Sequence, residues 1–301
     1  MLHNDTETFE QLILRTSEYT GIKPEIVEKD YYVTLFLQEL VKKIPDIVFK
    51  GGTSLSKCYR LIERFSEDID LNILADTKPS ESKRKQLKAG IIAVIEQLDF
   101  TLVNPDDVKS RREFNRYVID FPSVMSSAYL KERLIVETAI YQRAYPTKRM
   151  KASSFIYQYL SQNGFDDFVF ENHLEPFELN VQTAERTLVD KLYALADYYM
   201  GETIAEHSRH IYDIYKLLNI VEINNDLKSL VKQVAEERKP NSRCYSVQDG
   251  VDIKQVLTEI LENEIYKQDY EAITKKLLFE NVSYETAITG LKTIVESNLF
   301  D

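Results

Sequence analysis

The sequence predicts an α+β protein in which a strand-containing part with a mixed sheet, residues 1–182, precedes a helical bundle, residues 183–301. Two patterns support this division. Short stretches of strand character surround a glycine pair at 51–52 and recur over 114–140. From residue 183 onward the apolar side chains recur at helical spacing instead. With 301 residues, the chain is long enough to form two modest domains with sizeable cores.

The composition excludes several classes of protein. Hydrophobic residues make up 44% of the chain and charged residues 29%, as in ordinary globular proteins. No apolar run is long enough for a transmembrane helix, and the N-terminus lacks the basic and apolar regions of a secretory signal. The two cysteines and four histidines form neither a disulfide framework nor a zinc-ligand spacing. We therefore expect a soluble cytoplasmic protein that does not contact the membrane.

The charge is unevenly distributed along the chain. A net charge of −11 argues against wholesale coating of nucleic acid. Residues 83–151 are nevertheless net basic, and such asymmetry would bring a polyanionic substrate to one face. Solvated helix faces would explain the same residues equally well, so the pattern leaves nucleic-acid contact open.

Helical spacing in the N-terminal part predicts helices over 7–20, 24–43 and 80–98. Pro24 suits the first turn of the second helix, because a first-turn residue needs no N–H partner within the helix. The charged residues 28–30 follow directly and are expected to form an exposed first turn.

A short apolar strand over 47–50 leads into the glycine pair. Gly51 and Gly52 lack a Cβ, so their backbone can approach a phosphate closely. Thr53 or Ser54 is suited to cap the helix that follows, and the free N–H groups of a helix N-terminus attract anions. This segment is therefore a candidate phosphate-binding site.

Two aspartates lie on the next predicted strand, 68–74. Because alternate residues of a strand point the same way, Asp68 and Asp70 project together while Ile69 and Leu71 face the other side. Paired carboxylates suit hard cations, and two magnesium ions held there would bridge a triphosphate and an attacking hydroxyl. A glycine pair or an Asp-x-Asp alone is usually a turn or a solvated strand. Their order here favours metal-dependent nucleotidyl transfer.

Two further strands are predicted over 114–121 and 134–140. Glu137 lies within the second and is flanked by apolar residues. It is either a third metal carboxylate beside Asp68 and Asp70 or an edge-strand residue in water. Sequence spacing alone does not decide between these alternatives.

The C-terminal part is expected to be entirely helical. Thr183 can cap a helix that contains Lys191, whose ammonium suits a phosphate, although the same spacing is typical of a solvent-facing lysine. A second helix over about 204–219 places Arg209 and Asp213 four residues apart, the usual spacing of a surface ion pair. Further helical patterns cover 225–237, 251–266, 268–278 and 283–298.

Five motifs, taken in order, resemble the abortive-infection AbiEii/AbiGii toxin family of nucleotidyltransferases. They are Glu28–Val33, Lys50–Leu55, Arg64–Leu71, Asp190–Ala194 and Arg209–Asp213. The resemblance spans about Val27 to Tyr215 and implies a polymerase-β-like nucleotidyltransferase core. One departure is His210, where the last motif often has a second acidic residue.

The resemblance also implies roles for individual residues. Asp68 and Asp70 would be catalytic metal ligands for Mg²⁺ or Mn²⁺, and Lys191 and Asp213 would be catalytic residues from the helical half. Glu137 is kept as a third metal ligand. The residues expected at the nucleotide are Gly51, Gly52, Thr53, Ser54 and Lys57.

Members of this family are toxins paired with an antitoxin protein, and some resemble enzymes that extend the 3′ end of tRNA. The leading hypothesis is transfer of a nucleoside monophosphate from an NTP to an RNA, such as a tRNA 3′ end, or to a protein. One alternative is modification of a small molecule such as an antibiotic. Another is a nucleotide-binding interaction module without turnover, which would not need paired metal carboxylates.

Overall fold

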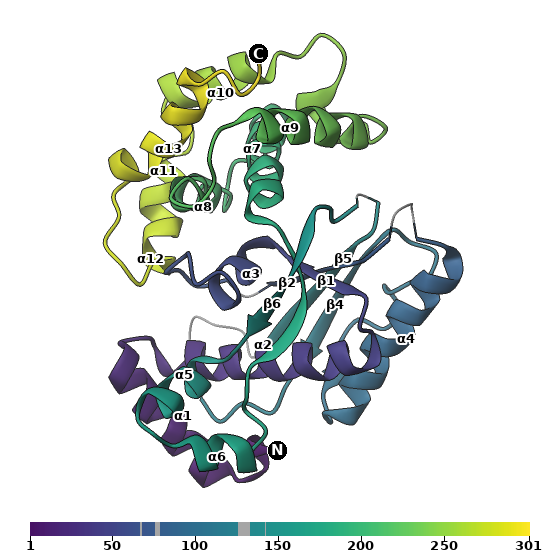
Figure 1. The fold of residues 1–301 in the computed structure, drawn as a ribbon, viewed down its shortest axis with the longest axis vertical. Coiled ribbons are helices and arrows are strands. Elements are labelled where there is room, and N and C mark those ends of the chain that lie inside the picture. The colour runs from purple at the N-terminus through teal and green to yellow at the C-terminus, as the bar shows by residue number, and fades with distance from the viewer. Residues whose placement is uncertain (67, 76–78, 126–132, 142) are drawn as a thin grey trace. The chain divides into compact units, whose positions relative to one another are not determined.

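The computed structural model describes residues 1–66, 68–75, 79–125, 133–141 and 143–301, and these divide into two compact units (Figure 1). Residues 1–59 and 66–182 form the first, called here the sheet unit. Residues 60–65 and 183–301 form the second, the helical unit. The predicted α+β class is confirmed.

A seven-stranded mixed sheet organises the described part of the sheet unit, in the order β3-β4-β5-β2-β1-β7-β6. β1 pairs antiparallel with β2 and parallel with β7, and β2 pairs parallel with β5. The sequence patterns identified four of these strands and missed β3, β6 and β7. The strands are β1 Ile47–Lys50, β2 Asp68–Ile73, β3 Thr101–Leu102, β4 Phe114–Asp120, β5 Arg133–Ala139, β6 Thr147–Ala152 and β7 Phe177–Gln182.

Helices cover one side of this sheet. α2 contacts β5 and α4, and α4 contacts β3; Figure 1 shows both helices on the same side. Ile69 and Leu71 of β2 point into this core and are fully buried, whereas Asp68 and Asp70 are only partly buried. The predicted alternation of β2 is therefore confirmed. The helices of the unit are η1 Leu2–Asn4, α1 Thr6–Thr20, α2 Pro24–Lys43, α3 Gly51–Lys57, α4 Glu81–Gln97, α5 Phe155–Gln162 and α6 Asp166–Glu171.

The charged segment 28–30 of α2 is largely buried, contrary to the expected exposed turn. Glu28 and Lys29 are 1% and 2% exposed. The Glu28 carboxylate accepts hydrogen bonds from the Ser123 hydroxyl and from the backbone N–H groups of Val124 and Met125. The prediction was wrong because the polar partners that make burial tolerable come from a segment almost a hundred residues away.

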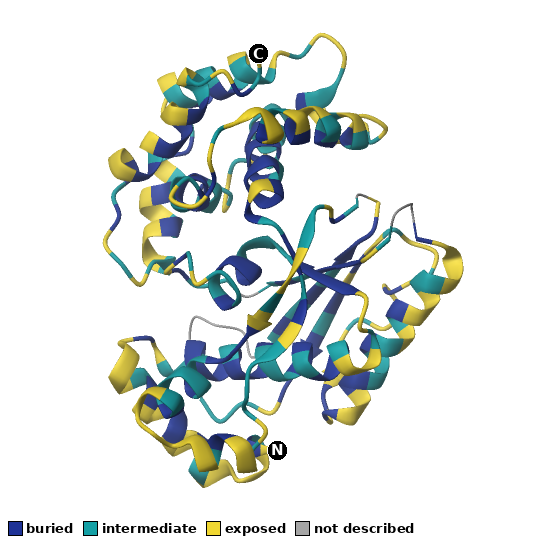
Figure 2. Ribbon diagram, in the orientation of Figure 1, coloured by how far each residue is buried: buried dark blue, intermediate teal, exposed yellow. Residues whose placement is uncertain are grey.

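Buried residues in the helical unit are most numerous on α7, and α8, α9 and α13 contribute further ones (Figure 2). Thr183 caps α7 as predicted, since its side chain accepts from the N–H of Arg186. α8 packs against α7 and α13, and Gly290 of α13 allows a close approach: a Cβ there would lie 2.7 Å from the Tyr215 Cα. The helices are α7 Ala184–Met200, α8 Arg209–Leu217, α9 Asn225–Arg238, η2 Tyr245–Val247, α10 Ile253–Glu262, α11 Lys267–Asp269, the π-turn η3 Tyr270–Thr274, α12 Lys275–Leu277 and α13 Tyr284–Glu296.

Three predicted helices of this unit differ in extent, and one of them, α10, ends at Glu262 and not at residue 266. α8 starts later than expected, because Asp269 accepts hydrogen bonds from the N–H groups of Glu206 and Ser208 and holds the preceding segment outside the helix. The helix expected over 268–278 is interrupted by η3. Within the described ranges, no helix has the length and apolar character needed to span a membrane.

The segment 60–65 connects α3 to β2 in sequence but is anchored in the helical unit. The Phe65 N–H donates to the Leu277 carbonyl, and the Phe279 N–H donates to the Glu63 carbonyl, both at 2.8 Å. The Glu63 N–H donates to the Tyr212 hydroxyl at 2.9 Å. The segment that connects the glycine motif to the aspartate motif is therefore part of the helical unit.

Candidate functional site

The turn from β1 into α3 depends on Gly51. Its φ of +73° lies in the left-handed region that favours glycine. A Cβ added there would lie 2.0 Å from Oδ2 of Asp70, so the aspartate carboxylate occupies the space that a side chain would need. From the sequence, we predicted that the backbone at Gly51 would approach a phosphate closely. The structure also assigns it a contact with the aspartate motif.

Thr53 and Ser54 do not cap α3, contrary to expectation. Lys50 is the N-cap residue, and none of the described side chains supplies a capping hydrogen bond. Both hydroxyls are buried and bond inside the unit: Thr53 donates to the Asp68 carbonyl at 2.6 Å, and Ser54 to the Gly51 carbonyl at 2.8 Å. Thr53 therefore ties α3 to the start of β2. The capping prediction failed because the helix already begins at Gly51, so that Thr53 and Ser54 lie within its first turn.

Three carboxylates stand on the same face of the sheet. Asp68 and Asp70 project from β2, and Glu137 stands on the neighbouring parallel strand β5 in register with Asp70. On the other neighbouring strand of β2, Lys50 of β1 is also in register with Asp70. The pairing of β2 with β5 therefore brings Glu137 beside the aspartates.

The electrostatics of Glu137 reflect these neighbours. Burial raises the pKa of its carboxyl to about 7, and the charges of Asp70 and Asp68 contribute to the rise. Arg116, whose Nε lies 3.6 Å from Glu137 Oε1, and Lys50 oppose the shift. The described residues include no group of three His, Cys, Asp or Glu side chains arranged to hold a metal ion.

Lys57 is held inside the sheet unit. Its ammonium lies 2.5 Å from the Asp30 carboxylate and 2.5 Å from the Thr34 hydroxyl, and its side chain is 4% exposed. The other Asp30 oxygen accepts from the Phe155 N–H at 2.8 Å. The sequence predicted Lys57 at the nucleotide, whereas here it joins α3 to α2.

Asp213 is the centre of a buried ion cluster in the helical unit. Its side chain is 0% exposed, and its two oxygens accept hydrogen bonds from Nε and Nη2 of Arg64, both at 2.7 Å. The Lys191 ammonium also donates to Asp213 and lies 3.5 Å from Nδ1 of His210. Asp213 is therefore not a surface partner of Arg209, because Arg64 and Lys191 enclose it.

The cluster shifts the pKa values of Asp213, Lys191 and His210. Burial alone would raise the pKa of Asp213, but Arg64 and Lys191 hold it well below its usual range. Burial lowers the pKa of Lys191; Asp213 opposes that shift and Arg64 reinforces it. Burial and the neighbouring Lys191 and Arg209 lower the pKa of His210, so its imidazole is neutral at pH 7.

The predicted residues therefore fall into two groups. The sheet unit brings together Gly51, Asp68, Asp70 and Glu137, and the helical unit brings together Lys191 and Asp213. Sequence reasoning gave no individual role to Arg64, although it opens the motif that contains both aspartates.

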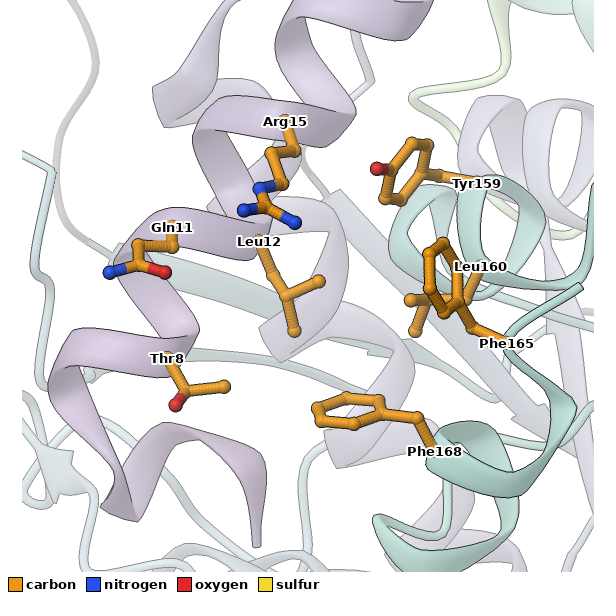
Figure 3. Close-up of a pocket in the computed structure, with 8 residues that line it drawn as sticks. All are labelled: Thr8, Gln11, Leu12, Arg15, Tyr159, Leu160, Phe165 and Phe168. Atoms are coloured by element: carbon orange, nitrogen blue, oxygen red, sulfur yellow. The ribbon is translucent and has the colours of Figure 1, made fainter. Parts of the chain in front are cut away.

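A pocket in the sheet unit is lined by none of these residues. It is formed by α1, α5 and α6, and Figure 3 shows Arg15 facing an aromatic wall across it. Its lining contains no carboxylate, so it does not suit metal-assisted chemistry. The lining residues are Thr8, Gln11, Leu12, Arg15, Tyr159, Leu160, Phe165 and Phe168.

Comparisons with known proteins agree with the resemblance of the motifs. The family model described as nucleotidyl transferase AbiEii toxin, type IV TA system, matches residues 35–290. Among solved structures, the chain is similar to MenT4, a nucleotidyltransferase toxin from Mycobacterium tuberculosis H37Rv, with a TM-score of 0.54 and 15% identity. The match covers 95% of this chain and 88% of that chain, and at this identity it supports the fold. Comparison with curated protein sequences found no significant match.

Proposed function

The chain belongs to the AbiEii family of nucleotidyltransferase toxins of type IV toxin–antitoxin systems, and on that basis we propose that it transfers a nucleoside monophosphate from an NTP to an RNA acceptor with a divalent metal. The observation that carries this proposal is that Asp70 and Glu137 are paired in register. Asp68 lies beside Asp70 on the same face of β2, and the turn at Gly51 lies against the Asp70 carboxylate. The net-basic stretch 83–151 is compatible with an RNA acceptor.

The chemistry of these side chains fits magnesium or manganese. Asp68, Asp70 and Glu137 supply only carboxylate oxygens, the ligands that hard cations prefer. The raised pKa of Glu137 includes a contribution from carboxylate repulsion that a bound cation would relieve. When bound, the metal would neutralise the triphosphate and stabilise the entering and leaving oxygens.

The remaining roles belong to the chain's own residues. Gly51 leaves room for the Asp70 carboxylate, and Thr53 fixes the backbone at Asp68. Lys191 would bind the triphosphate, with Asp213 as the residue that orients its ammonium. The acceptor hydroxyl attacks the α-phosphorus in line, a P–O bond forms, and pyrophosphate leaves as the bond to the β-phosphate oxygen breaks.

Transfer of radiolabel tests the proposal. Purified protein is incubated with cellular RNA and each α-labelled NTP, with Mg²⁺ or Mn²⁺, and RNA and protein are separated. We expect label in RNA, reduced to background by Asp70→Asn and retained in Glu178→Gln, a matched change of an exposed carboxylate on β7. The absence of label in RNA with all four NTPs would contradict the proposal. Label in protein alone would reassign the acceptor.

Metal binding is tested independently of turnover. Titration with Mn²⁺ should raise the melting temperature of the wild-type protein, because a ligand that binds only the folded state stabilises it. Asp70→Asn should remove this increase and Glu178→Gln should keep it. An equal increase in wild type and Asp70→Asn would exclude Asp70 as a ligand.

Membership of a type IV system also implies an antitoxin encoded with this chain. We propose that the chain acts in the cytoplasm, where its RNA acceptor would be found. Expression in a bacterial host should arrest growth, and co-expression of the neighbouring antitoxin gene should relieve the arrest. Antibiotic resistance without growth arrest would instead favour a small-molecule acceptor.

A further inference from the structure

Strand β6 carries exposed cations at one edge of the sheet, where it is the last strand in the part of the chain that the structure describes. Arg149 and Lys151 are both exposed, and this pair is called here the basic edge. The surrounding stretch 141–152 contains four Lys or Arg residues and no Asp or Glu. Glu178 of β7 lies 3.6 Å from Nη2 of Arg149, but both side chains are more than half exposed, so water screens this pair. The basic edge can therefore attract an anionic ligand from solution.

The strand pairing places the basic edge on the face of the sheet that carries the carboxylates. Arg149 lies opposite Asn180 of β7, and Asn180 lies opposite Val48 of β1. Lys50, two residues after Val48, lies opposite Asp70 of β2. Residues in register point to the same side of a sheet, and so do alternate residues of one strand. The basic edge therefore faces the same side as Asp70, three strands and about 14 Å away.

Other cations of the net-basic stretch 83–151 lie behind the sheet. Lys85 and Arg111 lie 3.2 and 3.8 Å from Oε1 of Glu81, which belongs to α4. This helix packs with α2 on the side of the sheet opposite the carboxylates (Figure 1). The sequence shows only a net-basic stretch, whereas the structure separates the basic edge, which shares the face of the carboxylates, from the cations at α4.

An exposed aromatic ring lies close to the basic edge in the chain. Tyr145 is 53% exposed and precedes the first residue of β6 by two positions. Unpaired RNA bases stack on aromatic side chains, and RNA phosphates bind Lys and Arg. Cations on an edge strand discourage pairing with a further protein strand. The chemistry of this edge therefore suits single-stranded RNA better than the addition of a strand from another chain.

We propose that the basic edge and Tyr145 bind the single-stranded 3′ segment of the acceptor RNA. Arg149 and Lys151 contact phosphates upstream of the terminal ribose, and Tyr145 stacks on an unpaired base. The terminal hydroxyl, which is the nucleophile of the proposed function, then reaches the carboxylates along the same face. The inference rests on the proposed function for the identity of the acceptor, but binding at this surface requires no turnover.

Fluorescence anisotropy tests the surface in the absence of NTP and metal. The probe is a labelled single-stranded RNA oligonucleotide with a free 3′ hydroxyl, titrated with the full-length protein at several salt concentrations. Arg149→Gln/Lys151→Gln should raise the Kd by about tenfold or more. It should also lower the slope of log K against log salt by about 1.4, or about 0.7 for each lost phosphate contact. Lys85→Gln/Arg111→Gln removes the same charge behind the sheet, and should keep the Kd within about twofold of wild type and the slope unchanged.

Tyr145→Leu is a second variant that tests the surface independently of charge. Loss of stacking should raise the Kd by about fivefold or more, while the salt slope stays at the wild-type value because no phosphate contact is removed. In the transfer assay, Tyr145→Leu and Arg149→Gln/Lys151→Gln should raise the KM for RNA and leave the KM for NTP unchanged. All of these substitutions change exposed side chains, and thermal denaturation confirms that the variants are folded.

Several outcomes would overturn the inference. One is an equal RNA affinity and salt slope in wild type and in Arg149→Gln/Lys151→Gln. Another is aggregation of that variant with unchanged RNA affinity, because the cations would then serve only to protect the exposed strand edge. If the variant does not fold, Tyr145→Leu decides: a raised Kd supports the inference, and a wild-type Kd overturns it.

Failure of the proposed function would look different. RNA that binds at the basic edge but takes no label would overturn the transfer reaction and leave this surface in place. Label transfer with a wild-type KM for RNA in Arg149→Gln/Lys151→Gln would overturn only the surface.

Discussion

There is no room for a side chain at Gly51, because an added Cβ would lie 2.0 Å from Oδ2 of Asp70. The two residues come from different elements, and each constrains the other. Because Lys50 of β1 is paired with Asp70 of β2, the turn that begins at Gly51 lies next to the Asp70 carboxylate. The glycine thus connects backbone conformation to the orientation of a proposed metal ligand.

The first prediction concerns this contact. Gly51→Ala should destabilise the protein by about 2–3 kcal/mol, because it combines left-handed strain with a collision at Asp70. It should also abolish the stabilisation by Mn²⁺, measured by thermal denaturation. Gly164→Ala is the matched control: its φ is +78°, but nothing lies within 4 Å of an added Cβ. That change should cost about 1 kcal/mol and leave the Mn²⁺ effect intact. Equal effects of both changes would mean that Asp70 does not constrain the glycine.

The second prediction concerns pH. The pKa of Glu137 is raised to about 7 from an ordinary value near 4.5, so the folded protein favours its protonated form. The stability associated with this group is fully present below about pH 4.5 and is lost as the pH rises through 7. Glu137→Gln mimics the protonated form. Without metal, it should be more stable than wild type by about 1–2 kcal/mol at pH 8 and similar at pH 4.5.

Denaturation by urea at the two pH values measures this difference. Glu178→Gln, the exposed carboxylate on β7, should change stability by less than about 0.5 kcal/mol at either pH. If Glu137→Gln were no more stable than wild type at pH 8, the raised pKa of Glu137, which burial and then the charges of Asp70 and Asp68 cause, would be refuted.

Elements are joined in the sheet unit by buried ion pairs as well as by apolar packing. Asp30 of α2 binds Lys57 of α3 and accepts from the first N–H of α5 at Phe155. The helices α2 and α3 and the distant α5 therefore meet at one carboxylate. Since α3 begins at Gly51, this pair also holds the element that carries the glycine turn.

The third prediction is that Asp30→Asn costs about 3–5 kcal/mol, because it leaves Lys57 buried without a counter-charge. The double variant Asp30→Asn/Lys57→Met should recover part of this loss, since neither charge then remains. Urea denaturation followed by circular dichroism measures both. Lys275→Ala removes an exposed pair with Glu271 and should cost less than about 1 kcal/mol. A double variant less stable than Asp30→Asn would show that the pair is not the source of the effect.

The whole molecule consists of two units, and a short segment between two parts of the sheet unit, residues 60–65, belongs to the helical unit. Residues 60–65 lie between the glycine and aspartate motifs, yet their hydrogen bonds are made with α8, α12 and the residues after α12. The link between the units is therefore a built part of the helical unit and not only a linker. If the helical unit unfolds locally, the hydrogen bonds that hold residues 60–65 should break at the same time.

The fourth prediction tests this link by hydrogen exchange. Tyr212→Phe removes the hydroxyl that accepts from the Glu63 N–H and donates to Glu280. Exchange of the Glu63 amide should accelerate by about tenfold, while that of Ile69 in β2 should not change. Tyr284→Phe is the control, because the buried Tyr284 hydroxyl has no partner among the described residues. Equal acceleration at Glu63 and Ile69 would indicate that the two units open together.

Much of the local structure followed from the sequence. Period-two alternation placed Asp68 and Asp70 on the same face of a strand, and Thr183 identified the start of α7. The order and spacing of the motifs were enough to identify the family. These inferences succeed because strand and helix periodicity, and capping, depend on residues only a few positions apart.

Other features required the tertiary structure. The place of Glu137 depends on the parallel pairing of β5 with β2, and the partners of Asp213 depend on a connector far away in sequence. Lys57 has the charge to bind a phosphate, but the packing of α3 on α2 places Asp30 beside it.

The sequence by itself therefore determined the chemical groups that are present, a glycine turn and paired aspartates. It also determined the family and the enzyme class. The tertiary structure alone decided which charges face one another. Periodicity reports the face on which a residue stands, whereas compensation of a buried charge depends on groups brought together from distant parts of the chain.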